Sequence, residues 1–129
     1  MDIQPIFRCA VGMDIHLAII HVCVILQEPS CEPVVYRRQF GAFQRDRRAM
    51  AEWVAGFAPD TVVMESTGSD FQSPYAALER VGIRALVVNA QHVKKVPGRK
   101  TDINDAEWLA MLARAGRLAR QFHPARTLA

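Results

Sequence analysis

Residues 9–26 read CAVGMDIHLAIIHVCVIL and contain two runs of β-branched and other apolar residues, 9–16 and 18–26. Such runs are typical of strands. Only a few residues around position 17 separate them, so the sequence predicts a β-hairpin. The prolines of QEPSCEP (27–33) then indicate a turn. VVYRRQF (34–40) has the alternation of a third strand, and we expect the three strands to form an antiparallel meander.

Beyond residue 41 the spacing of apolar residues changes to that of a helix. Met50, Trp53, Val54 and Phe57 follow an i, i+3, i+4, i+7 pattern, which predicts an amphipathic helix over 42–57. The later segments are expected to alternate between strand and helix: strand 61–66, helix 73–82, strand 84–89, a basic loop over 90–100 and a last helix over 102–121. A strand that follows a helix is expected to run parallel to its neighbour.

The predicted order of elements is βββαβαβα, which is the order of the ribonuclease-H-like fold. We therefore expect an α/β domain with a mixed five-stranded sheet. The chain has 129 residues, half of them hydrophobic, which suits one domain with a substantial core. The domain is expected to span 1–129, with flexible ends at 1–8 and 125–129.

Composition restricts the function classes. The net charge of +3 and the pI of about 9.0 permit a polyanionic partner without demanding one. No segment has the form of a signal peptide or of a membrane span of roughly 20 apolar residues, so a cytoplasmic protein is expected. Cys9, Cys23 and Cys31 lack the spacing of a metal or redox pair. Reduced thiols are expected, with a disulfide as the alternative.

Asp102 and Asp105 stand at the predicted start of the last helix. At 100° per residue they fall on the same side as Leu109 and Ala113, the stripe that should face the core or a cleft. One interpretation is structural, because Asp102 can cap the helix and Asp105 can complement its dipole. The other is that both carboxylates belong to a site.

Two further acids, Asp14 and Glu65, lie in or at the end of apolar strands. Asp14 could instead terminate its strand in the hairpin, and Glu65 could cap the turn that follows it. In a ribonuclease-H-like layout, however, the first strand lies beside the strand after the first helix, and the last helix begins across their ends. Four carboxylates could therefore converge on one patch.

Like charges gathered in this way recruit a cation or raise one another's pKa. Oxygen ligands select Mg²⁺ or Mn²⁺ over zinc. Two such ions can hold the attacking and leaving oxygens of a phosphoryl transfer. The acids therefore predict a two-metal phosphodiester-cleaving centre.

Several motifs, VGMDIH, VVMESTG, VVNAQHVKKVPGRKTDINDAEWLAMLARAGRL and QFHP, resemble the N-terminal RuvC-like domain of DEDD transposases of the insertion-sequence "IS one-ten" family, relatives of the pilin-gene invertases. The resemblance covers residues 10 to 124. It implies that Asp14, Glu65, Asp102 and Asp105 are the catalytic and metal-binding acids. It also implies Mg²⁺ or Mn²⁺, DNA cleavage and strand transfer in transposition, a structured guide RNA, a homo-oligomer, and association with the nucleoid of a bacterial cell.

The chain departs from the family pattern in two ways. Asp70 stands where a tyrosine is usual, and only Phe71 of an aromatic pair remains. Family members also continue into a second domain with a catalytic serine, so we expect an excised domain or a truncated gene product without complete strand transfer. Ser66 does not take over that role. The alternatives are a free-standing junction-resolving nuclease, or a non-catalytic nucleic-acid-binding or dimerising fragment.

Basic residues lead into the last helix and are expected to contact phosphates: Lys94, Lys95, Arg99 and Lys100. The alternative is a solvated loop. A second basic group is expected to form a solvated face, with RNA binding as its alternative: Arg37, Arg38, Arg45, Arg47 and Arg48. The four histidines have no metal-ligand spacing and are interpreted as structural or surface residues: His16, His21, His92 and His123.

Overall fold

The computed structural model describes residues 5–16, 18–66, 70–94, 96–100 and 102–118. Five strands and four helices follow one another as β1 (Cys9–His16), β2 (Ile19–Leu26), β3 (Val34–Phe40), α1 (Gln44–Ala55), β4 (Thr61–Ser66), α2 (Gln72–Arg80), β5 (Leu86–Asn89), α3 (Ala90–Lys94) and α4 (Asp105–Arg114). No helix in this part of the chain is long and apolar enough to span a membrane.

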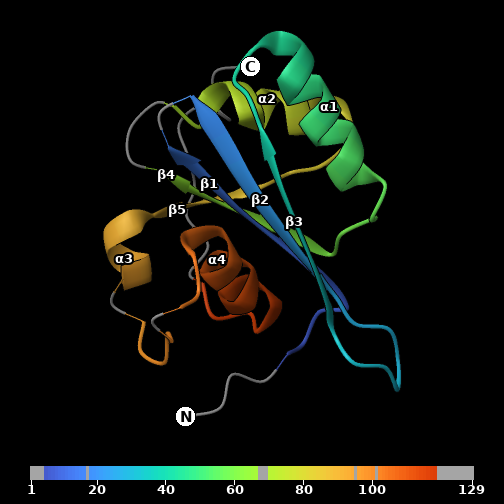
Figure 1. Cartoon of the computed structure of the whole chain (residues 1–129), viewed down its shortest axis with the longest axis vertical. Coiled ribbons are helices and arrows are strands. Elements are labelled where there is room, and N and C mark those ends of the chain that lie inside the picture. The colour runs from blue at the N-terminus through green and yellow to red at the C-terminus, as the bar shows by residue number, and fades with distance from the viewer. Residues whose placement is uncertain (1–4, 17, 67–69, 95, 101, 119–129) are drawn as a thin grey trace.

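The strands form one mixed sheet in the order β3-β2-β1-β4-β5. β1, β2 and β3 pair antiparallel, whereas β4 pairs parallel with β1 and β5 pairs parallel with β4. This confirms the predicted meander and the predicted direction of the strands that follow helices. β1 lies at the centre of the sheet, which places the residues of its carboxyl end between two neighbouring strands (Figure 1).

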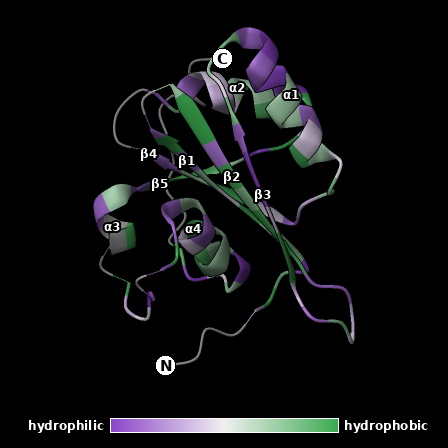
Figure 2. Ribbon diagram, viewed as in Figure 1, coloured by the Kyte–Doolittle hydropathy of each residue, from purple (hydrophilic) through white to green (hydrophobic). Residues whose placement is uncertain are grey.

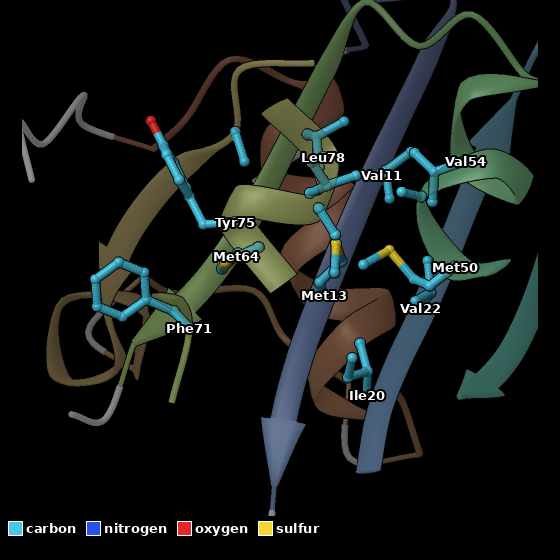
Figure 3. Packing of buried hydrophobic residues seen from close by; sticks show 14 of the residues in the cluster. Val11, Met13, Ile20, Val22, Met50, Val54, Met64, Phe71, Tyr75 and Leu78 are labelled. Carbon is cyan, nitrogen blue, oxygen red and sulfur yellow. The ribbon is translucent and has the colours of Figure 1, made fainter. Parts of the chain in front are cut away.

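Helices cover both faces of the sheet. α1 and α2 pack on one face through a cluster that includes Met13, Val22, Met50 and Leu78 (Figure 3). α4 covers the other face, where Trp108, Leu109 and Leu112 pack against apolar side chains of β1, β4 and β5. The apolar residues gather on the central strands, and polar residues dominate much of the connecting segments (Figure 2). Burial on both faces accounts for the nearly continuous apolar runs of β1 and β2.

Three predicted boundaries were wrong. The segment 90–100 was expected to be a loop, but α3 occupies its first five residues, and the side chain of Asn89 accepts a hydrogen bond from the N–H of Gln91 at its start. The last helix was expected from Asp102, but α4 begins at Asp105. By contrast, α2 is followed by Gly82 with φ of 85°, as expected for a C-terminal stop. The last helix was also expected to extend to Gln121, but α4 ends at Arg114, and Gly116 follows it with φ of 68°.

Candidate metal and nucleic-acid site

Asp14 and Glu65 lie beside each other on the two central strands. The parallel pairing of β1 with β4 runs from Ala10 opposite Thr61 to Met13 opposite Met64. Asp14 and Glu65 are the next residues on each strand, so their backbones are about 4.8 Å apart. Both residues are partly buried. The sheet therefore brings together two of the four predicted acids, which are far apart in the sequence.

Both acids project from the face that α4 covers. Two residues earlier on each strand, Gly12 touches α4 and Val63 belongs to the hydrophobic cluster of Trp108. Because successive side chains of a strand point to opposite faces, Asp14 shares the face of Gly12 and Glu65 that of Val63. The acids thus lie under the region where α4 begins.

Gly12 allows α4 to rest directly on β1. A Cβ atom at this position would lie 2.3 Å from the carbonyl oxygen of Ala106 and 2.4 Å from the amide nitrogen of Ala110. No side chain fits into this space, so the first turns of the helix approach the strand backbone as closely as a glycine permits. Asp105 precedes Ala106, and its position is set by this contact.

Asp105 is paired with a residue of the basic segment before α4. The Arg99 Nη2 atom lies 2.8 Å from Asp105 Oδ1 and also donates to the carbonyl oxygen of Ile103 at 2.7 Å. The Asp105 side chain is 54% exposed. The arginine therefore ties the segment that contains it to the first residue of the helix.

Asp102 lies in a turn ahead of the helix and is exposed. It is not the helix cap, because the Asn104 side chain accepts the N–H of Glu107 at 2.8 Å and occupies that position. The prediction from helical periodicity that Asp102 lies on the inner stripe was therefore wrong, since α4 does not include it. The capping alternative for Asp102 was wrong for the same reason.

The described residues contain no group of three His, Cys, Asp or Glu side chains close enough to hold a metal ion. The structure thus joins Asp14 to Glu65 and leaves Asp105 with Arg99. The donors are all carboxylate oxygens, which suit Mg²⁺ or Mn²⁺. The chemistry of the donor set fits these ions.

The remaining predicted nucleic-acid contacts belong to the segment that connects β5 to α4. Lys94 is the last residue of α3, and Lys100 is exposed. Lys95 lies outside the described residues.

Asp70 is exposed at the position of the usual tyrosine, whereas Phe71 is buried and packs edge-on against Tyr75 with ring centroids 6.4 Å apart. Phe71 thus belongs to the hydrophobic core.

Sequence reasoning missed His21 and Gln39 as neighbours of the acids. His21 lies directly opposite Asp14 on β2, and Gln39 lies opposite His21 on β3. The signal was present in the hairpin, because pairing of His16 with Ile19 requires that Asp14 face His21. A histidine beside one acid is a site neighbour even without a ligand motif.

Cys9, Cys23 and Cys31 are free in this structure, and Cys9 and Cys23 are buried in different hydrophobic clusters. Burial raises the pKa of the Cys23 thiol to about 12, and burial also raises the pKa of Cys9. Both are protonated at neutral pH, and neither has the thiolate that a nucleophile needs.

Comparison with known sequences assigns the chain to a family. A family model described as "Transposase", that of the DEDD transposases of the IS one-ten type, matches residues 11–129. The chain belongs to this family. No curated protein is significantly similar to it.

Solved structures that resemble this transposase domain include two of RuvC. The Thermus thermophilus RuvC structure has a TM-score of 0.62 at 13% sequence identity, covering 88% of this chain and 99% of that chain. T. thermophilus RuvC in complex with Holliday junction substrate has a TM-score of 0.59 at 13% identity, with the same coverage. At this identity the likeness concerns the fold, and the transposase domain has the ribonuclease-H-like, RuvC-like fold that was predicted.

Proposed function

We propose that this transposase domain cleaves and transfers DNA strands with divalent metal ions held by Asp14, Glu65, Asp102 and Asp105. The observation that carries the proposal is the adjacency of Asp14 and Glu65 on the face covered by α4. Strand positions hold these two carboxylates rigidly, and Gly12 lets α4 bring Asp105 to the same region. Asp102, in the turn before the helix, would complete the set.

A pair of Mg²⁺ or Mn²⁺ ions at such a site supplies activation of the attacking oxygen and stabilisation of the leaving oxygen at a phosphodiester. The protein contributes the fixed placement of the carboxylates. Asp14 has the central role, because β1 lies between the strand of Glu65 and the strand of His21. Asp105 would contribute from the first residue of α4, whose position the contact with Gly12 sets.

Arg99 has two roles in this proposal. Its ion pair neutralises Asp105, and a guanidinium and a divalent cation compete for the same carboxylate. Asp105 would hold the cation, and Arg99 would contact phosphates together with Lys94, Lys95 and Lys100. Metal binding and nucleic-acid binding would then support each other.

DNA is the proposed substrate. RuvC of T. thermophilus shares the fold and has been solved with a Holliday junction substrate, which supports branched DNA as a ligand of this chain. The family further suggests a structured guide RNA and a homo-oligomer. The same structure favours one alternative, a free-standing junction-resolving nuclease. Cleavage of a four-way DNA junction by this chain without RNA would decide for that alternative.

The metal site is tested by titrating Mn²⁺ and measuring bound ions by electron paramagnetic resonance, with and without a DNA junction. Asp14→Asn and Glu65→Gln should weaken binding by about tenfold or more, roughly 1.4 kcal/mol. Arg99→Gln should strengthen it, because a competing cation is lost. Glu52→Gln is the control, since Glu52 is exposed on α1 across the sheet. Equal Mn²⁺ affinity in Asp14→Asn and Glu52→Gln would refute the proposed site.

A further inference from the structure

A polar pocket lies beside the acids, on the side of β2 and β3. It has a volume of about 220 Å³, is open to solvent, and is lined by residues of these two strands and of the start of α4. Its lining includes five residues with side-chain N–H donors: His21, Arg37, Arg38, Gln39 and Asn104. The guanidinium of Arg38 lies over the rings of Phe40 and Trp53.

The pocket begins where the two adjacent acids end. Gln39, His21 and Asp14 are consecutive partners across β3, β2 and β1, and Glu65 follows on β4. These four residues form one row across the sheet. Because they occupy equivalent positions in the pleat, the row lies on the face of α4. A strand of nucleic acid that passes Asp14 along this row therefore reaches the pocket next.

Arg37 supplies the positive charge of the pocket. Its Nη2 and Nε atoms both donate to Glu107 Oε1, at 2.7 and 3.2 Å. The Arg37 side chain is 54% exposed, whereas that of Glu107 is 17% exposed. The largely buried Glu107 carboxylate thus holds the Arg37 guanidinium in place. The N–H groups of Arg37 that do not take part in these two bonds can donate to another acceptor.

The amide of Asn104 has its oxygen already engaged. Because Oδ1 accepts the N–H of Glu107, the NH₂ group of the same amide remains as a donor. Gln39 brings a second amide, and His21 brings a ring N–H. A pocket lined by the fixed guanidinium of Arg37, a second arginine and several other N–H donors suits an anion with several acceptor oxygens.

The volume of the pocket restricts the size of the ligand that it can bind. Pockets for drug-sized molecules usually have volumes of about 300–1,000 Å³, so 220 Å³ suits a phosphate group better than a whole nucleoside. We propose that the pocket binds a phosphate of the substrate strand beside the phosphate cleaved at Asp14 and Glu65, with Arg37 as its charged contact. The inference rests on the proposed function, because that function brings a nucleic-acid strand past Asp14.

The two partners of one ion pair provide matched variants for the test. Arg37→Gln removes the phosphate contact, whereas Glu107→Gln breaks the same ion pair and leaves the cation in place. Binding of a fluorescent four-way DNA junction, and of an RNA hairpin, is measured by anisotropy over a series of salt concentrations with Ca²⁺. For DNA, Arg37→Gln should reduce the slope of log K against log salt by about 0.9 in magnitude, the value for one phosphate contact. Glu107→Gln should keep the slope of the wild type or steepen it.

Several results would overturn the inference. An unchanged slope in Arg37→Gln on both polymers would show that Arg37 contacts no phosphate. Equal loss of binding in both variants would assign the effect to the broken ion pair. A wild-type chain that binds neither polymer would also overturn it. A slope that changes on RNA alone would identify RNA as the source of the phosphate and overturn the assignment to a DNA strand.

Mn²⁺ binding separates this outcome from the proposed function. If Asp14→Asn loses Mn²⁺ but Arg37→Gln leaves the salt slope unchanged, the metal site stands and the pocket proposal fails. If the wild type binds no Mn²⁺ but Arg37→Gln still reduces the slope, the pocket stands and the proposed metal chemistry fails.

Discussion

Gly12 has no side chain, so the backbone of β1 lies directly against α4 at this position. A methyl group there would overlap the backbone of Ala106 and Ala110, and backbone atoms cannot rotate away as a flexible side chain can. The helix itself would have to move, and Asp105 would move with it. A residue without functional groups thus sets the separation between the acids of the strands and that of the helix.

Gly12→Ala is therefore expected to impair both stability and metal binding. Overpacking of this kind costs about 1–3 kcal/mol. Gly82→Ala is the matched control, because Gly82 has a φ of 85° with no atom within 4 Å of the added methyl, so only backbone strain results. Urea denaturation should show a loss of stability in both variants. Mn²⁺ affinity of the folded protein should fall only in Gly12→Ala, and an equal affinity in both would contradict this role.

At the scale of elements, α4 shows what the sequence could predict. Its apolar spacing located a helix whose inner stripe contains Leu109 and Ala113, and both are buried. The first residue of the helix could not be predicted, because Asp102, Asn104 and Asp105 are all of types found at or near helix starts. The contact of Ala106 with Gly12 fixes the position of the helix, and periodicity carries no information about it.

The candidate site was predictable to a similar extent. Alternation within strands and the order of elements were enough to place Asp14 beside Glu65. The pairing of Arg99 with Asp105 depends on the path of an irregular segment, for which the sequence has no periodic signal. The part that could not be predicted is therefore the part formed by a loop against a helix end.

Two substitutions at the start of α4 should separate its stability from its binding. Asn104→Asp keeps a good helix cap but places a negative charge at the pocket, whereas Asn104→Ala loses a cap worth about 0.5–2 kcal/mol. Asn104→Asp should thus be the more stable variant and the weaker binder of DNA. Thermal denaturation and anisotropy measure the two rankings. If the more stable variant also binds DNA more tightly, the pocket does not bind an anion through this end of the helix.

At the scale of the whole molecule, the sheet separates two apolar layers, and one buried thiol lies in each. Cys9 belongs to the cluster shared with α1 and α2, and Cys23 packs with Ala106 and Ala110 of α4. Because each of these two thiols is buried among apolar side chains, the folded protein favours its protonated, neutral form. Cys31 is exposed and has no such constraint.

Stability should consequently fall at high pH. The Cys23 thiol has its pKa raised by burial from 9.0 to about 12, so the folded state favours the proton. This contribution is fully present below pH 9 and is lost as the pH rises from about 9 toward 12. Urea denaturation at pH 7, 9 and 10.5 measures the decline. Cys23→Ala should decline less steeply than the wild type, whereas Cys31→Ala should follow it, and identical declines in all three would contradict the assignment.

The docking of α4 on β1 also determines the order in which contacts can form while the chain is synthesised. β1, β2 and β3 are neighbours in the sequence, so their pairing requires only short loops to close. The contact between Gly12 and Ala106 joins an early strand to a much later helix, and it can form only after the intervening strands and helices have been synthesised. During translation, Asp14 and Glu65 therefore leave the ribosome before Asp105 does. The proposed centre built from these acids would therefore be complete only after α4 has folded, so the growing polypeptide would carry no assembled metal site before that point.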